Sequence, residues 1–208
     1  MKPSEKLKIK IIERDAFEDD KLPFDMIHSP ILDVGSSYFS RKHQFPNKKY
    51  YSLDFNPDCN PSVVGDAKLL PFKNGSFNTV LCLSLLEHVD NPEKAVEEMY
   101  RVIKTGGIAV VVVPFVYFRH DWADYTRYTI QGIENLLKNK KFKILKTEKV
   151  CPGVFSTFIS WLVPITHNQP KLLKNINKTI LKTMLRTSKK LDFGKDRCYS
   201  HISVIVQK

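Results

Sequence analysis

The fold is decided first by one short stretch, Ile31-Leu32-Asp33-Val34-Gly35-Ser36-Ser37. An apolar run that contains one acid ends there in a glycine, which lets the chain turn sharply and lets a ligand approach the backbone. Further strand-like apolar runs follow at residues 50–53, 63–64, 79–83, 108–113, 142–150 and 200–206. Several of them are almost continuously apolar, which predicts strands buried on both faces, as in a parallel sheet covered by helices.

Two helices are expected between the later strands. Asn91-Pro92-Glu93 has the form of a helix start, with a capping side chain, a proline at the first helical position and an acid in the first turn. This helix has one apolar face and is expected to end at Thr105-Gly106-Gly107. A second helix is expected from Thr129 to Asn139. Strands that alternate with helices predict an α/β fold with ligands at the carboxyl ends of the strands.

The length and the charge distribution indicate one large domain with a basic C-terminal part. The chain has 208 residues, of which 42% are hydrophobic and 26% charged, a composition that excludes a disordered chain. We expect an N-terminal extension over residues 1–28 and one domain over residues 29–208, with a basic helical insertion at 152–196. Residues 151–208 hold 10 of the 33 Lys and Arg but 2 of the 22 Asp and Glu, so an anionic partner is expected there.

The sequence favours a cytoplasmic protein. The first residues do not have the pattern of a secretory signal, and no apolar run reaches the ~18 residues that a spanning helix needs. The four cysteines lie far apart, which is typical of free thiols in a reducing compartment and indicates no metal site. Peripheral membrane contact through residues 154–190 is an alternative, because an apolar stretch there precedes an amphipathic helix with a lysine face.

Polar residues follow the predicted strands and form a candidate cofactor site. Asp54 ends the second strand, where an acid can accept hydrogen bonds from both ribose hydroxyls of a nucleotide. Asp66 and Ala67 follow the third strand, where a carboxylate and a backbone N–H can contact an adenine edge. The fourth strand is followed by residues 84–89, Ser-Leu-Leu-Glu-His-Val.

These residues resemble the class I S-adenosylmethionine-dependent methyltransferases, in particular the group with a short methyltransferase-domain core. Four elements stand in the family's order, namely LDVG at 32–35, Asp54, GDAKLLPFKNGSFNTV at 65–80 and LLEHVDNPEKAVEEMYRVIKTGG at 85–107. The resemblance implies a doubly wound, mostly parallel, seven-stranded Rossmann-like sheet with an antiparallel last strand. The helical insertion would lie before that last strand.

The resemblance also implies S-adenosylmethionine as cofactor. Carried over by position, Asp33 and Gly35 would lie beside its methionine part, while the acids at 54 and 66 would hold its ribose and adenine. The family's glycine-rich turn usually has a second glycine where this chain has Ser37, and another small residue where it has Phe39. The candidate cofactor-binding residues are Asp33, Gly35, Asp54, Asp66, Ala67, Ser84 and Leu85.

An aromatic segment at 115–128, FVYFRHDWADYTRY, is expected beside the reactive methyl group. Aromatic faces stack on sugars or flat rings, and arginine or aspartate can hold hydroxyls, phosphates or carboxylates. The best candidate base for a hydroxyl acceptor is His120, because histidine titrates near neutral pH, and Asp121 or Asp124 could orient it or act instead. The candidate substrate-binding residues are His88, Tyr117, Arg119, Trp122, Asp124, Tyr125 and Arg127.

The sequence therefore predicts an S-adenosylmethionine-dependent methyltransferase acting on an oxygen, or a nitrogen, of a small-molecule, saccharide or lipid-linked acceptor. One alternative is a non-catalytic binding module that keeps the fold, which Ser37 and Phe39 favour. Another is an RNA methyltransferase, since a basic face beside aromatic residues also serves nucleic acids. Against RNA stands the absence of an Asn-Pro-Pro-Tyr-type motif after the fourth strand, where residues 83–86 are Leu-Ser-Leu-Leu.

Overall fold

The structure, a computed structural model, describes residues 22–38, 40–117, 119, 122–155, 157, 193–194 and 197–208. The chain divides into two compact units. The larger comprises Leu22–Pro114, Arg119–Glu148 and Ile202–Lys208, and the smaller includes Phe115–Phe118 and Lys149–His201. The proposed base His120, its neighbour Asp121 and most of the predicted insertion lie outside the described residues, so the predictions about them stay predictions.

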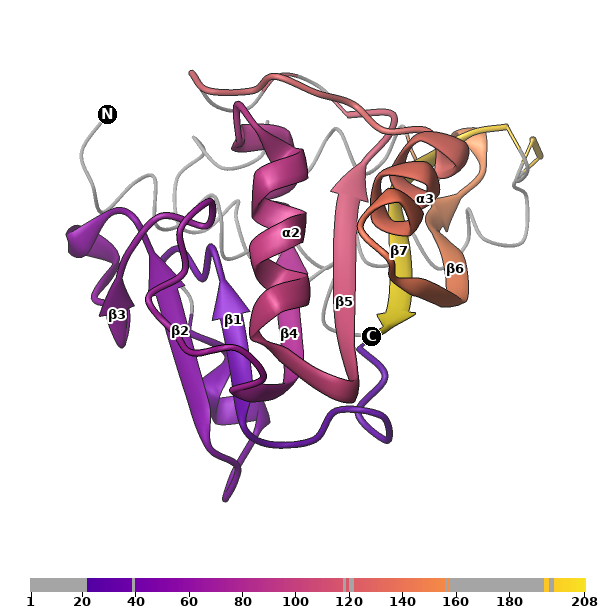
Figure 1. Cartoon of the computed structure of the whole chain (residues 1–208). Helices are drawn as coiled ribbons and strands as arrows, with labels where there is room; N and C mark the ends of the chain where they lie inside the picture. The colour runs from indigo at the N-terminus through magenta and orange to yellow at the C-terminus, as the bar shows by residue number, and fades with distance from the viewer. Residues whose placement is uncertain are drawn as a thin grey trace. The chain divides into compact units, whose positions relative to one another are not determined.

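Seven strands form one sheet in the order β3-β2-β1-β4-β5-β7-β6 (Figure 1). Strands β1 to β5 are parallel neighbours in this order. Strand β7 is antiparallel to β5, because Gly106 and Gly107 near the start of β5 exchange backbone hydrogen bonds with Lys208 just after the end of β7. The predicted sheet is thus confirmed. Its strands are β1 (Ile31–Val34), β2 (Tyr50–Asp54), β3 (Val63–Val64), β4 (Phe77–Leu83), β5 (Ile103–Pro114), β6 (Lys143–Pro152) and β7 (Tyr199–Gln207).

The residues before β1 belong to the core of the larger unit. Leu22 and Ile27 are buried in a cluster with side chains of β1, β2, β4 and β5. The backbone of His28 exchanges two hydrogen bonds of 3.0 Å with the hydroxyl of Thr79 in β4. Residues 22–28 therefore pack on the sheet, although the sequence analysis assigned them to an extension.

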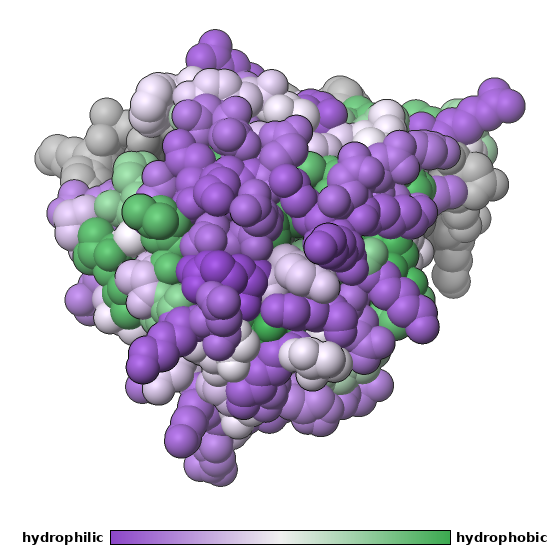
Figure 2. Space-filling model, in the orientation of Figure 1, coloured by the Kyte–Doolittle hydropathy of each residue, from purple (hydrophilic) through white to green (hydrophobic). Residues whose placement is uncertain are grey.

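Helix α2 (Pro92–Val102) packs on the sheet beside β5 (Figure 1). Its start is as predicted, since the side chain of Asn91 accepts the N–H of Lys94 at 3.0 Å. The predicted apolar face is buried, whereas hydrophilic side chains cover the outer face of the helix (Figure 2). The buried residues of the predicted face are Ala95, Val96, Met99, Val102 and Ile103.

The predicted end of this helix is wrong. Helix α2 stops at Val102, Ile103 is already extended, and the Thr-Gly-Gly stretch at 105–107 lies inside β5. The carbonyls at the helix end are instead capped by the amine of Lys208, which donates to Tyr100 at 2.7 Å and to Ile103 at 2.8 Å. A cation thus caps the negative end of the helix in place of a glycine turn.

Helix α3 (Ile130–Asn139) starts as predicted, because the hydroxyl of Thr129 accepts the N–H of Gly132 at 3.0 Å. Three short 3₁₀ turns, η2 (Arg41–Gln44), η3 (Pro57–Cys59) and η4 (Leu86–His88), lie in loops that follow β1, β2 and β4. Within the described ranges, no helix combines the length and the apolar character that crossing a membrane requires.

Candidate active site

The predicted cofactor residues lie together at one edge of the sheet. Strands β1, β2, β3 and β4 are parallel neighbours, so their carboxyl ends meet at the same edge. The turn after β1 carries Gly35, the end of β2 carries Asp54, and the loop after β3 carries Asp66. Ser84 and Leu85 follow β4 directly. Parallel pairing thus brings residues from four separate parts of the sequence to one place.

The turn after β1 is held tightly by the end of β2. The backbone N–H groups of Gly35 and Ser36 both donate to the carbonyl of Leu53, at 2.8 and 3.1 Å. The N–H of Ser37 donates to Oδ2 of Asp54 at 2.8 Å. Gly35 and Ser37 have φ angles of +73° and +53°, so the serine takes a left-handed conformation that costs a non-glycine residue about 1–2 kcal/mol.

Asp33 is enclosed within the protein. Its side chain is completely buried, and its Oδ2 accepts a hydrogen bond of 2.5 Å from the hydroxyl of Tyr50. The same hydroxyl accepts the backbone N–H of Arg41 at 3.0 Å, and the guanidinium of Arg41 lies 3.4 Å from Oδ2. Burial and the adjacent carboxylate raise the pKa of Tyr50, which keeps the phenol protonated as a donor. Asp33 is thus hydrogen-bonded to Tyr50 within the core, whereas the resemblance implies that it contacts the cofactor.

Asp54 both organises the site and remains able to accept further hydrogen bonds. Each of its oxygens accepts one backbone N–H, Oδ2 from Ser37 at 2.8 Å and Oδ1 from Asn56 at 3.0 Å. A carboxylate offers about four acceptor positions in all, so about two remain for hydroxyls of a ligand. The next residue, Phe55, is 74% exposed and was missed by the sequence analysis.

The loop after β3 presents Asp66 to solvent and buries Ala67. The side chain of Asp66 is 56% exposed, and its Oδ1 accepts the N–H of Lys68 at 2.8 Å. The amine of Lys68 lies 3.8 Å from Asp66 and donates to Asp90, before helix α2, at 2.6 Å. These contacts raise the pKa of Lys68 and lower the pKa of Asp90. Lys68 therefore joins the loops that follow β3 and β4.

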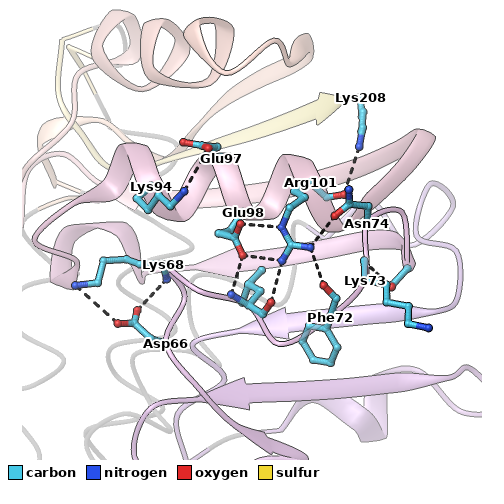
Figure 3. Close-up of polar contacts among 12 residues, drawn as sticks. Asp66, Lys68, Phe72, Lys73, Asn74, Lys94, Glu97, Glu98, Arg101 and Lys208 are labelled. Atoms are coloured by element: carbon cyan, nitrogen blue, oxygen red, sulfur yellow. Dashed lines mark hydrogen bonds and ion pairs between the residues drawn. The ribbon is translucent and has the colours of Figure 1, made fainter.

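The far end of the same loop is anchored to α2 by an ion pair (Figure 3). Glu98 and Arg101 pair through two hydrogen bonds of 2.8 and 2.7 Å. The guanidinium also donates to the carbonyls of Leu70 and Phe72, at 2.9 and 2.7 Å, and Glu98 accepts the N–H of Leu70 at 2.9 Å. Hydrogen bonding to Arg101 lowers the pKa of Glu98. This anchor was not predicted from the sequence, although a Glu three residues before an Arg has the spacing of an ion pair on a helix.

Leu85 lies directly over Gly35. A Cβ atom added at Gly35 would come within 2.7 Å of Cδ1 of Leu85, and within 3.0 Å of its Cδ2 and Cγ. Any side chain at position 35 would therefore clash with Leu85. The preceding residue, Ser84, has a left-handed φ of +51°. The two predicted cofactor segments thus contact each other at this point.

The 3₁₀ turn η4 holds the described part of the predicted acceptor segment. The carbonyl of Ala123 accepts a hydrogen bond of 2.5 Å from Nδ1 of His88, which must carry the proton because a carbonyl can only accept. The N–H of Tyr125 donates to the carbonyl of Glu87 at 2.7 Å. Figure 1 shows this segment crossing above the N-terminal end of α2 before it enters α3. His88 therefore positions the segment.

Two aromatic side chains of this segment are available at the surface. Trp122 is 77% and Tyr125 is 58% exposed, and Arg119 donates to the carbonyl of Trp122 at 3.1 Å. Asp124 and Arg127 form an ion pair through both ends of the guanidinium, so they hold each other. The other predicted residue, Tyr117, belongs to the smaller unit, where its ring lies 5.1 Å from that of His201.

The chemistry of this edge suits the nucleoside part of S-adenosylmethionine. Asp54 can accept the ribose hydroxyls, and the exposed Asp66 can accept the adenine amino group. The methionine part meets a more enclosed region, because Asp33 is buried and Leu85 covers Gly35. Among the described residues, no cluster of three or more His, Cys, Asp or Glu side chains is arranged to hold a metal ion.

Comparisons with known proteins agree with the fold. The model of the family described as "Methyltransferase domain" matches residues 33–111, which include the end of β1, all of β2, β3, β4 and α2, and most of β5. The chain is similar over 98% of its length to the solved structure of a SAM-dependent methyltransferase from Archaeoglobus fulgidus. That likeness has a TM-score of 0.59 at 13% identity, covers 94% of the other chain and supports the fold.

Curated proteins are similar to part of the chain. The chain is 30% identical over 109 residues to norajmaline N-methyltransferase of Rauvolfia serpentina, which covers 49% of this chain and 33% of that protein. It is 31% identical over 144 residues to a ubiquinone/menaquinone biosynthesis C-methyltransferase of Ruegeria sp., which covers 69% of this chain and 51% of the relative. The chain thus spans between a third and about half of these relatives' lengths. The chain thus matches the methyltransferase-domain family over residues 33–111, and these two curated proteins to which it is similar are methyltransferases.

Proposed function

We propose that this protein binds S-adenosylmethionine at the carboxyl edge of β1–β4 and catalyses transfer of its methyl group to a small-molecule or saccharide acceptor. The observation that carries the proposal is the position of Asp54. It ends β2 within the matched core, fastens the turn after β1 and keeps acceptor capacity for ribose hydroxyls. The match of residues 33–111 to the methyltransferase domain supports the same cofactor.

The residues of this chain would mainly align the two reactants. When bound, the cofactor would supply a methyl group on a positively charged sulfur, and in-line attack of an acceptor lone pair on the methyl carbon would break the carbon–sulfur bond. Asp54 and Asp66 would hold the nucleoside, and the turn η4 would hold the acceptor segment through His88 and Glu87. Alignment and exclusion of water are the main contributions that a protein makes to such a displacement.

The exposed aromatic residues suggest the type of acceptor. Trp122 and Tyr125 can stack on a flat ring or a sugar, and Arg119 beside them can hold an anionic or hydroxyl group. We propose oxygen or nitrogen as the methylated atom, with His120 or Asp121 as the base for a hydroxyl acceptor. The names of the two curated relatives specify N- and C-methylation, so an acceptor screen has to include carbon nucleophiles as well.

Calorimetric titration with S-adenosylmethionine tests the first step of this proposal. We expect saturable binding by the wild-type protein and weaker binding by Asp54→Ala, while the matched control Asp58→Ala, at an exposed position in η3, binds normally. Wild-type protein that binds no cofactor at high micromolar concentration would instead support a non-catalytic module.

Formation of S-adenosylhomocysteine tests the second step. The screen offers hydroxylated rings, amines, saccharides and quinols in turn, with Trp122→Ala as the variant that removes a stacking surface. We expect that variant to raise KM for the acceptor and to leave cofactor affinity unchanged. An equal weakening of acceptor binding and cofactor binding would contradict a role of Trp122 in holding the acceptor.

A further inference from the structure

The contact between Leu85 and Gly35 bears on how the cofactor enters. Glycine at the turn after β1 leaves one side of the backbone open, yet three carbon atoms of Leu85 already fill that side. They lie within 3.0 Å of where a Cβ would stand. The side of the turn that a ligand would approach is therefore occupied by a side chain of the protein itself.

The backbone donors around this contact are also engaged. The N–H groups of Gly35 and Ser36 donate to Leu53, and that of Ser37 donates to Asp54. Asp33 is buried, and Tyr50 donates to its Oδ2, while its Oδ1 accepts no hydrogen bond from the described residues. The amino-acid part of a ligand thus meets no uncommitted backbone N–H of Gly35, Ser36 or Ser37.

Leu85 has the properties of a movable side chain. It is only partly buried, and it lies in the short connection between β4 and η4, after the left-handed Ser84. Its side chain has no polar atoms, so changing its rotamer breaks no hydrogen bond. The free-energy cost of displacing Leu85 is therefore the loss of its apolar contacts, which is part of the free energy of burying one leucine side chain.

We propose that Leu85 gates the methionine end of the cofactor site and thereby determines how strongly the protein discriminates between ligands with and without the amino-acid chain. This inference rests on the proposed cofactor function. A ligand with the full methionine chain displaces Leu85 from Gly35 before it fits. A ligand that ends after the sulfur uses Asp54 and Asp66 and leaves Leu85 in place.

The test compares the binding of S-adenosylmethionine with that of 5′-methylthioadenosine, which has the same nucleoside and sulfur but no amino-acid chain. In Leu85→Ala we expect the affinity for S-adenosylmethionine to rise about 5- to 30-fold relative to methylthioadenosine, the factor expected when a partly buried leucine need not be displaced. Leu85→Val should give a smaller rise and Leu85→Met almost none. The matched control Leu69→Ala changes an exposed leucine in the loop after β3 and should leave the ratio unchanged.

Each outcome decides one point. An unchanged or lower ratio in Leu85→Ala, together with clear binding of both ligands, overturns the gate and leaves the proposed function standing. Absence of binding of either ligand to the wild type overturns the proposed function itself. Thermal melting of every variant shows which are folded, and Leu85→Val keeps the test decisive should Leu85→Ala not fold.

Discussion

The two loops that contribute acids to the candidate site are held in opposite ways. The turn after β1 is tied down along its whole length, because its amides bind β2 and its acid, Asp33, is buried against Tyr50. The loop after β3 is anchored at its far end, where Arg101 holds Leu70 and Phe72, while Asp66 at its near end is exposed. The difference indicates that the first loop is rigidly held, whereas the second leaves the side chain of Asp66 accessible.

The largest effect is expected from Arg101→Ala. This change leaves the carboxylate of Glu98 without its guanidinium partner and two loop carbonyls without their donor. We expect the free energy of unfolding to fall by about 2–4 kcal/mol, measured by urea denaturation. Hydrogen exchange should speed up in residues 66–76 and stay slow in residues 33–37.

The control for this prediction is Lys94→Ala, on the same helix. Lys94 pairs with Glu97 at the surface, where solvent screens the pair and makes its contribution to stability small. A loss as large as that of Arg101→Ala would show that the helix as a whole, and not the anchor of the loop, had been disturbed.

The next largest effect is expected from Asp54→Ala on cofactor binding. Loss of ribose hydrogen bonds and of the support for Ser37 should weaken the affinity for S-adenosylmethionine by about 1.5–3 kcal/mol, measured by calorimetry. Since Asp54 is the residue through which the tightly held turn and the cofactor would meet, both hydrogen exchange in 33–37 and affinity should change. Unchanged affinity would contradict its placement against the ribose.

Tyr50→Phe is the converse test, because it loosens the turn after β1 instead of the loop after β3. It removes the donor to buried Asp33 and the acceptor for the N–H of Arg41, without changing the ring. We expect the free energy of unfolding to fall by about 1–2 kcal/mol, and exchange to speed up in residues 33–37 and at Arg41 but not in residues 66–76. Tyr51→Phe is the matched control, because its ring is 41% exposed and it should have almost no effect. Faster exchange in 66–76 would show that the loops are not independent.

The smallest effect is expected from pH. The pKa of Glu98 in the folded protein is below its ordinary value of 4.5 because Arg101 donates to the carboxylate. The pair therefore stabilises the fold fully above pH 4.5 and loses its contribution as the pH falls through the folded pKa. The stability difference between wild type and Glu98→Gln should be constant from pH 6 to 7 and shrink below about pH 4.5. A constant difference down to pH 3 would rule out an ionic anchor.

Local patterns were sufficient for the strands and the helix starts, whereas the seven-stranded sheet with its antiparallel last strand was implied by the family resemblance. Apolar runs such as residues 31–34, and caps such as Asn91 and Thr129, act over a few neighbouring residues, and the structure confirms them. The end of α2 was predicted wrongly because its cap, Lys208, lies more than a hundred residues away along the chain. Only the antiparallel pairing of β7 with β5 brings that amine to the helix.

The site was predicted only in part, because some of its features are local in the sequence and others depend on contacts between distant residues. Strand ends are visible in the sequence, so the positions of Asp54 and Asp66 at one edge follow from parallel pairing. The partners of Asp33 do not follow, since Tyr50 reaches it through the register between β1 and β2, and Arg41 through an irregular loop. The contact of Leu85 with Gly35 likewise depends on the exact approach of two loops, which no spacing encodes.

The anchor formed by Arg101 has a consequence for sequence variation. Its guanidinium binds main-chain oxygens of Leu70 and Phe72, and every residue type offers such an oxygen. The path of the loop is therefore independent of most of its side chains. Exposed positions such as Leu69 and Lys73 can be randomised while the backbone that carries Asp66 keeps its course.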